Sequence, residues 1–97
     1  NLSTFGFLSE LEKTICERKI NPSKSSYVSS LFEKDINKIA QKVGEEAVEL
    51  VIEAMDNNND LFKGEAADLL FHYLVLLEQR GIDFDEIIDV LRTRHSK

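Results

Sequence analysis

The stretch KVGEEAVELVIEAMDNNNDLFKGEAAD, residues 42–68, decides the fold and the chemistry that we predict for this chain. It contains two acidic pairs, Glu46-x-x-Glu49 and Glu65-x-x-Asp68, separated by a polar turn. Residues three apart lie at neighbouring positions on one face of an α-helix. If the two flanking helices are antiparallel and meet face to face, the four carboxylates converge on one small volume.

Four converging carboxylates need a cation between them, because they repel one another and because removing each from water is costly. A divalent ion offsets both effects, and carboxylate-rich sites with room for water suit magnesium or manganese. We therefore predict a Mg²⁺ site, with Mn²⁺ as the alternative ion, whose ligands are Glu46, Glu49, Glu65 and Asp68. The simpler interpretation of Glu46 and Glu49 alone is a solvated helix face, with Lys42 paired to Glu46.

Residue spacing argues against two other metal sites. Residues 56–60 resemble a calcium loop, but an EF-hand needs glycine at position six and glutamate at position twelve, where this chain has Leu61 and Ala67. A di-iron bundle takes a Glu-x-x-His pair from each of two helices, and the sequence contains no such pair. His72 instead follows Asp68 by four residues. It either supports the site or contacts substrate, or it is a hydrogen-bonded core histidine.

The composition limits the class of protein. The 97 residues suit one domain, and 42% hydrophobic residues is ordinary for a folded chain. The net charge of −6 argues against binding to nucleic acid backbones, and no apolar run reaches the ~20 residues of a membrane span. Cys16 is the single cysteine, so no internal disulfide can form and a reducing cytoplasm is the expected location.

Apolar residues recur at spacings of three and four through most of the chain, which predicts an all-α bundle of four to five helices. Ser3 and Asp35 are the expected N-caps of the first and third helices. Gly81 is expected to end the fourth helix, and Asp83 with Glu86 opens the last one as a capping box. The other predicted helices span residues 4–19, 27–34, 35–55 and 61–79.

The fourth predicted helix indicates a partner subunit. It is apolar nearly all round from Leu69 to Leu77, interrupted by His72. A helix without a polar face is buried on all sides, and so small a domain can hardly bury one completely. The third predicted helix has a heptad-like apolar seam of Ile36, Ala40, Val43, Ala47, Leu50 and Ala54. Gly44 within it costs about 1 kcal/mol relative to alanine, so either a neighbour approaches the backbone there or the position is simply tolerated.

The predicted metal site indicates a reaction at a phosphoanhydride, because magnesium usually binds substrate phosphates as well as carboxylates. The ion would neutralise developing charge while water attacks phosphorus. We assign catalytic roles to Glu46 and Glu49 as ligands and to Glu45 as the base that accepts the proton of water, with Glu53 as the alternative base. The candidates to hold the substrate are Lys38, Lys42, His72, Arg92, Arg94 and His95. For each basic residue taken singly, a solvated surface charge is the simpler interpretation.

Residues 39–49, IAQKVGEEAVE, resemble the signature of the phosphoribosyl-ATP pyrophosphohydrolase family. The similarity extends over most of the chain and includes residues 11–19, 26–27, 65–72 and 91–95. The family belongs to the all-α, MazG-like nucleotide pyrophosphatases, which have an E-x-x-E pair followed by an E-x-x-D pair. These positions correspond to the two acidic pairs chosen above on physical grounds.

The resemblance implies magnesium-dependent hydrolysis of phosphoribosyl-ATP to phosphoribosyl-AMP and pyrophosphate, the second step of histidine biosynthesis. It also implies a homodimer whose helices pack across subunits. Because the sequence has no initiator methionine, we hypothesise that residues 1–97 are the C-terminal domain of a bifunctional chain, following a phosphoribosyl-AMP cyclohydrolase. Two other functions stay open: a general house-cleaning nucleoside triphosphate pyrophosphatase, and a non-catalytic helical partner that has kept the acidic face.

Overall fold

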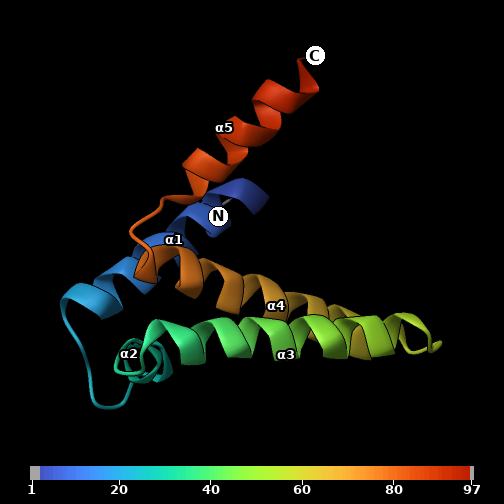
Figure 1. Cartoon of the computed structure of the whole chain (residues 1–97), viewed down its shortest axis with the longest axis horizontal. Coiled ribbons are helices and arrows are strands. Elements are labelled where there is room, and N and C mark those ends of the chain that lie inside the picture. The colour runs from blue at the N-terminus through green and yellow to red at the C-terminus, as the bar shows by residue number, and fades with distance from the viewer. Residues whose placement is uncertain (1–2, 97) are drawn as a thin grey trace.

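The computed structural model describes residues 3–96 and contains five helices and no strand in that range (Figure 1). The all-α prediction is therefore confirmed. The helices are α1 (Thr4–Ile20), α2 (Tyr27–Phe32), α3 (Ile36–Ala54), α4 (Asn59–Gln79) and α5 (Phe84–His95). None of the helices in this range is both long and apolar enough to cross a membrane.

Side-chain caps fix where the helices begin. Ser3 accepts a hydrogen bond from the Gly6 amide at 3.0 Å, and Asp35 accepts one from the Asn37 amide at 2.7 Å. Asp83 and Glu86 form the predicted capping box. These side chains satisfy amides that have no partner within the helix, so the expected starts of α1, α3 and α5 are confirmed.

Two predicted helix ends are wrong. We expected α4 to begin at Leu61, but Asn58 accepts a hydrogen bond from the Leu61 amide at 3.1 Å and so starts the helix at Asn59. An asparagine in a polar turn is as good an N-cap as an aspartate. We expected α2 to continue to Lys34, but it ends at Phe32. Gly81 ends α4 as predicted, with a positive φ of 71° that favours glycine.

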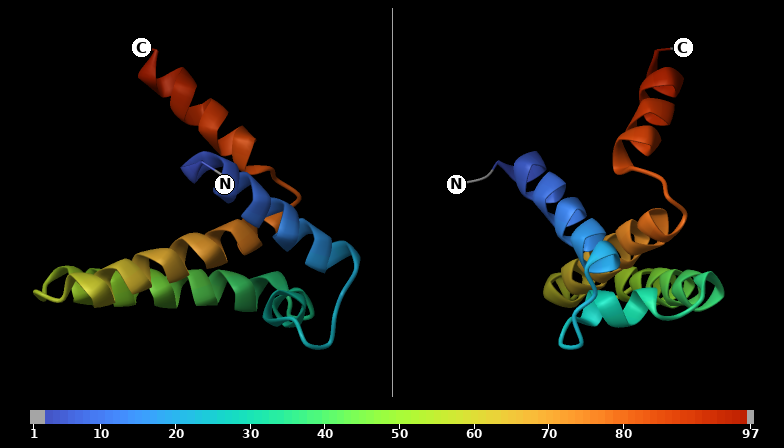
Figure 2. Two further views of the ribbon diagram at one scale, coloured as in Figure 1. Left: turned by 180° about the vertical axis from the view of Figure 1, so that it is seen from behind. Right: turned by 90° about the vertical axis from the view of Figure 1, so that its left-hand side faces the viewer.

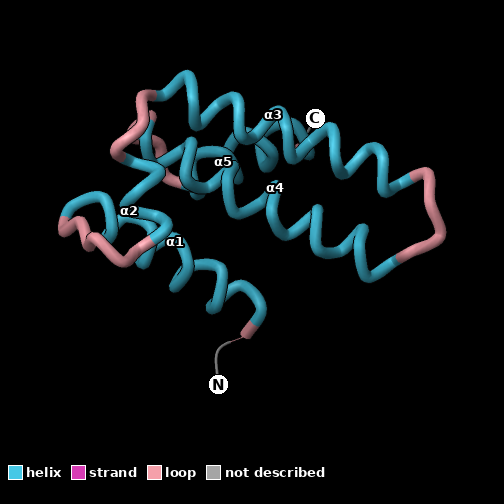
Figure 3. The backbone as a smooth tube through the Cα atoms, turned by 90° about the horizontal axis from the view of Figure 1, so that it is seen from below, coloured by secondary structure: helices cyan, strands magenta, loops and turns pink. Residues whose placement is uncertain are grey.

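Helices α3 and α4 form an antiparallel hairpin, in which they lie side by side and are joined by a short turn (Figures 1 and 3). Leu50 of the predicted seam packs toward α4, where it lines an apolar pocket with Leu69 and Tyr73. The most buried residue of α3 is Ile39, which we did not assign to the seam. It is buried because α1 and α2 pack over this end of the hairpin.

The core lies where α1 and α2 cover the second half of α4 (Figure 2). Lys19 at the end of α1 donates a hydrogen bond to the Glu78 carbonyl at 2.9 Å, which ties the two helices together. Ser29 of α2 donates one to the Arg18 carbonyl at 3.1 Å. The buried apolar residues of this core are Ile15, Leu31, Ile39, Leu74, Val75 and Leu77.

The other half of the hairpin is uncovered in a single chain. On α3, four exposed apolar residues at spacings of three and four form what we call the apolar stripe: Val48, Val51, Ile52 and Met55. Leu70 of α4 is 41% exposed. One chain thus leaves part of α4 open, as expected. Helix α5 projects away from the hairpin (Figure 1).

Gly44 lies four residues before Val48, at the end of the apolar stripe. A methyl group built on Gly44 would meet nothing within 4 Å in the described part of the chain, and the same holds for Gly64 in α4. We therefore expect Gly44→Ala and Gly64→Ala each to raise the free energy of unfolding by about 1 kcal/mol, measured by urea denaturation. A loss of stability confined to Gly44→Ala would instead indicate that a partner subunit approaches the backbone there.

Candidate active site

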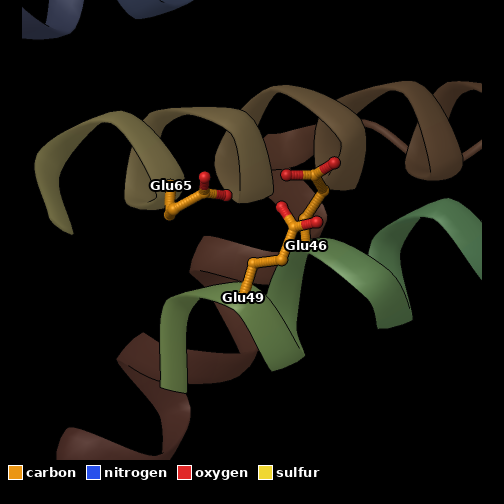
Figure 4. A group of neighbouring side chains, drawn as sticks. All are labelled: Glu46, Glu49 and Glu65. Carbon is orange, nitrogen blue, oxygen red and sulfur yellow. The ribbon is translucent and has the colours of Figure 1, made fainter. Parts of the chain in front are cut away.

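Three carboxylates meet between α3 and α4. Glu46 and Glu49 point from α3, and Glu65 points from α4 toward them (Figure 4). One oxygen atom of each lies within 4.8 Å of the others. The spacing of three residues places Glu46 and Glu49 on one face of α3, and the antiparallel hairpin brings Glu65 opposite. We call these three residues the carboxylate cluster.

The cluster contains oxygen atoms that lack a partner. Glu46 is only 5% exposed. Its Oε1 pairs with Lys42 Nζ at 3.2 Å, but its Oε2 is buried and finds no hydrogen-bond donor among residues 3–96; nor does Glu65 Oε2. Such orphan oxygens are costly, and a cation can satisfy them. Because all the donors are hard oxygens, the cluster fits magnesium or manganese better than a softer metal.

A proton partly replaces a cation when no metal is bound. When Glu65 is protonated it can donate a hydrogen bond to Glu49, which two ionised carboxylates cannot do. This hydrogen bond, together with burial and the nearby charges of Glu49, Glu46 and Asp68, raises the pKa of Glu65 to about 7. Near neutral pH Glu65 is therefore partly protonated, and a metal ion that bound to the cluster would displace this proton.

A pocket of about 630 Å³ adjoins the cluster. Lys42 connects the two, since it lines the pocket and pairs with Glu46 of the cluster. The pocket is lined by Tyr27, Leu31, Lys34, Lys38, Gln41, Lys42 and Glu45, and we call it the lysine pocket. The hydrogen bond to Glu46 raises the pKa of Lys42, so its ammonium stays charged. Three ammonium groups beside the carboxylate cluster can bind a chain of phosphates.

Comparison with known proteins identifies the family. The family described as phosphoribosyl-ATP pyrophosphohydrolase matches residues 8–95. This chain belongs to that family. It is 49% identical to a phosphoribosyl-ATP pyrophosphatase from Rhizorhabdus wittichii, over 92% of this chain and 84% of the relative. It is 44% identical to a phosphoribosyl-ATP pyrophosphatase from Lactiplantibacillus plantarum, over 93% of this chain and 85% of the relative.

Other members of the family are longer. The chain is 44% identical to the histidine biosynthesis bifunctional protein HisIE from Bacillus subtilis, over 96% of this chain but only 44% of the relative. It thus spans less than half the length of this relative and most of the length of the two pyrophosphatases.

Asp68, the fourth ligand predicted from the E-x-x-D pair of this family, is not part of the carboxylate cluster in the structure. Its side chain is exposed, yet its charge is close enough to contribute to the raised pKa of Glu65. An exposed aspartate can change rotamer at little cost. The role of Asp68 as a metal ligand therefore stays a prediction.

His72 is a buried, hydrogen-bonded histidine, only 5% exposed. Its Nδ1 lies 2.7 Å from the Asp68 carbonyl oxygen, and its Nε2 lies 2.8 Å from the Tyr27 hydroxyl. Both ring nitrogens are therefore used within the chain, which favours the core interpretation over a direct substrate contact. Sequence reasoning missed Tyr27 and Lys34. The spacing of four between Lys34, Lys38 and Lys42 was the one available signal for the second of these.

The basic residues of α5 lie apart from the cluster within one chain. Arg92 pairs with Asp89 at 2.6 Å and lines an apolar pocket between α1 and α5 with Phe84. The start of α5 contacts α1 and α4, since the Phe84 amide donates a hydrogen bond to Glu12 at 2.7 Å and the Phe84 ring packs edge-on against Tyr73. The assignment of Arg92, Arg94 and His95 to the substrate site stays a prediction that requires a second subunit.

The identity of the base stays open. Glu45 is exposed and lines the lysine pocket. Glu53 is half-buried near the hairpin turn, and its Oε2 has no hydrogen-bond partner among the described residues. Glu45 thus lines the same pocket as the three lysines, whereas Glu53 lies one helical turn beyond Glu49.

The raised pKa of Glu65 predicts how the stability of the metal-free protein depends on pH. The ordinary value of 4.5 applies to the unfolded chain and about 7 to the folded one, so the folded state binds more protons between these values. The Glu65 contribution to the free energy of unfolding is therefore fully present below pH 4.5 and is lost as the pH rises through about 7. We expect urea denaturation in EDTA to show this fall, and saturating magnesium to remove it.

Glu65→Gln is the matched control, because its amide can donate a hydrogen bond to Glu49 at any pH. This variant should lack the part of the pH dependence that Glu65 contributes in the wild type. Identical pH profiles for the two proteins would contradict the assignment of the retained proton to Glu65.

Proposed function

We propose that this chain hydrolyses phosphoribosyl-ATP to phosphoribosyl-AMP and pyrophosphate, the second step of histidine biosynthesis. The main support is the carboxylate cluster, with its buried orphan oxygens, directly beside the lysine pocket. Two relatives that align over most of their length are named phosphoribosyl-ATP pyrophosphatase, and longer relatives are named for histidine biosynthesis. A cluster for a cation and a pocket for phosphates together suit cleavage of a phosphoanhydride.

The residues of the site have different proposed roles. Glu46, Glu49 and Glu65 would hold Mg²⁺, or Mn²⁺ in its place, with Asp68 as the fourth ligand. When bound, the ion supplies charge neutralisation at the phosphoanhydride and lowers the pKa of water. Glu65 would release its proton to solvent when the ion binds, and a carboxylate beside the cluster would accept the proton of the attacking water.

The lysine pocket would hold the phosphates that leave as pyrophosphate. Lys38 and Lys42 line the pocket from successive turns of α3, and Lys34 lines it from the segment before that helix. Ammonium groups bind phosphate oxygens as point charges and tolerate the rotation of a flexible chain. Glu45 in the same pocket is our first choice of base.

We further propose that the chain functions as a homodimer. The apolar stripe leaves four large side chains exposed on one face of α3, and Leu70 of α4 is exposed as well. Contiguous exposed patches of this kind usually mark an interface. A second subunit would also bring the basic residues of α5 near the cluster of its partner, which one chain does not do.

The setting of the chain is also part of the proposal. By analogy with the longer relatives, we propose that it can be the C-terminal domain of a chain that begins with a phosphoribosyl-AMP cyclohydrolase. We place it in the cytoplasm, because its single cysteine allows no intrachain disulfide.

The deciding experiment is pyrophosphate release from phosphoribosyl-ATP with magnesium or with EDTA, with ATP and dUTP assayed in parallel. Magnesium-dependent release from phosphoribosyl-ATP alone is the expected result. Release from ATP and dUTP as well would indicate a general nucleotide pyrophosphatase with the same cluster. No release from any substrate would overturn the proposed activity and favour a non-catalytic helical partner.

A further inference from the structure

A chain of two hydrogen bonds links the lysine pocket to the turn of α4 beside the cluster. The carbonyl oxygen of Asp68 can only accept, so His72 Nδ1 must carry a proton and donate across the 2.7 Å between them. In the neutral ring Nε2 is then an acceptor, so the Tyr27 hydroxyl donates to it across 2.8 Å. The partners thus fix both the tautomer of His72 and the direction of the Tyr27 hydroxyl.

The position of the tyrosine ring is fixed as well. It stacks on Phe71 with centroids 6.2 Å apart and an interplanar angle of 22°, and it meets His72 edge-on at 5.9 Å. Tyr27 is nevertheless 51% exposed and lines the lysine pocket. Phe71 and His72 thus hold the Tyr27 ring in one orientation, while the exposed part of the ring can contact a ligand in the pocket.

The direction of the hydroxyl decides what it can bind. Its proton is donated to His72, so only oxygen lone pairs are left for the pocket. A phosphate oxygen is itself an acceptor and gains nothing from them, whereas an ammonium group has three N–H donors. Lys42 lines the same pocket, and its one ion pair among residues 3–96 is with Glu46. Tyr27 is therefore suited to act on a phosphate through a lysine.

We propose that Tyr27 is a positioning residue of the lysine pocket, which His72 holds in place and which orients Lys42 toward a phosphate group of the ligand. The proposal rests on the proposed function for the identity of that ligand. If Glu46 held a cation, Lys42 would lose part of its attraction to this carboxylate. The oxygen of Tyr27 would then keep the ammonium group in the pocket, close to the phosphates beside the cluster.

The test is the binding of inorganic pyrophosphate, in magnesium, to the full chain by isothermal titration calorimetry. Tyr27→Phe removes one oxygen and leaves the stacked ring. Loss of one hydrogen bond to a charged group should weaken binding roughly 10-fold, and the KM for phosphoribosyl-ATP should rise more than kcat falls. Tyr73→Phe is the matched control, because Tyr73 packs edge-on against Phe84 and lies outside the pocket. Its pyrophosphate affinity should match the wild type.

A double-mutant cycle separates positioning from general structural damage. In His72→Asn the side-chain amide can still donate to the Asp68 carbonyl but is too short to reach Tyr27. If His72 acts through Tyr27, His72→Asn weakens pyrophosphate binding in the wild type and has no further effect in Tyr27→Phe. Additive losses would overturn the proposal, and so would unchanged pyrophosphate binding in Tyr27→Phe.

Failure of the proposed function gives a different result. Pyrophosphate binding is measured whether or not phosphoribosyl-ATP is hydrolysed. A wild type that binds pyrophosphate, shows the coupling of Tyr27 and His72, but does not hydrolyse phosphoribosyl-ATP would overturn the activity and keep the role of Tyr27. A wild type that does not bind pyrophosphate would overturn the role of Tyr27.

Discussion

Glu49→Gln is expected to lower the turnover of phosphoribosyl-ATP at least ~100-fold and to weaken magnesium binding to a similar extent. Mutations that only support a metal ligand typically cost 10–100-fold, so loss of a ligand should cost at least as much. Glu49 is an exposed member of the cluster, so the substitution should leave the core of the protein intact. Pyrophosphate release and magnesium calorimetry measure the two effects.

The same variant should gain stability when no metal is present. Above about pH 7, where Glu65 is ionised, glutamine removes one of three repelling charges and can donate a hydrogen bond to Glu65. Glu49→Gln should therefore unfold at a higher urea concentration than the wild type in EDTA, and magnesium should stabilise it less. Glu33→Gln changes an exposed carboxylate outside the cluster and should alter neither property. Full turnover in Glu49→Gln would refute the role of the cluster.

Ile52→Glu is expected to convert the proposed homodimer into a monomer. Ile52 is 59% exposed in one chain and lies in the middle of the apolar stripe. An uncompensated charge buried at an interface costs about 3–5 kcal/mol, which corresponds to a dissociation constant raised roughly 100-fold or more. Sedimentation velocity over a range of concentrations measures the change. Turnover should fall with the dimer if α5 of one subunit completes the site of the other.

The control for this experiment is Ile20→Glu. Ile20 is 68% exposed at the end of α1 and lies outside the apolar stripe. It should leave the oligomeric state unchanged. A wild type that sediments as a monomer at all concentrations, or an Ile52→Glu variant that remains a dimer, would exclude the stripe as the interface.

Local signals in the sequence were enough to predict the hairpin and three of its carboxylates. Glu46 and Glu49 share a helix face by their spacing alone, and a polar turn before the next helix brings Glu65 back against them. The caps Ser3 and Asp35 were equally readable, because a cap acts within its own first turn. Asn58 shows the limit of this reasoning, since several residues of the turn were possible caps.

The rest depended on contacts between segments distant in the sequence. Tyr27 and His72 are 45 residues apart, and no periodicity links them. The apolar stripe is exposed because α1, α2 and α4 cover other sides of α3. The spacing of apolar residues along the sequence does not say which side of a helix its neighbours cover. The path of α5 likewise depends on the hydrogen bond between the Phe84 amide and Glu12.

The antiparallel hairpin affects how the chain folds and how the domain can be fused to another domain. All three residues of the carboxylate cluster lie between Glu46 and Glu65, on two helices joined by one short turn. Short loops close at low entropic cost, and local contacts form early. The hairpin can therefore assemble before the N-terminal helix docks on it. A carboxylate cluster contained in so short a segment does not depend on what precedes the domain, which suits a family whose members have two different lengths.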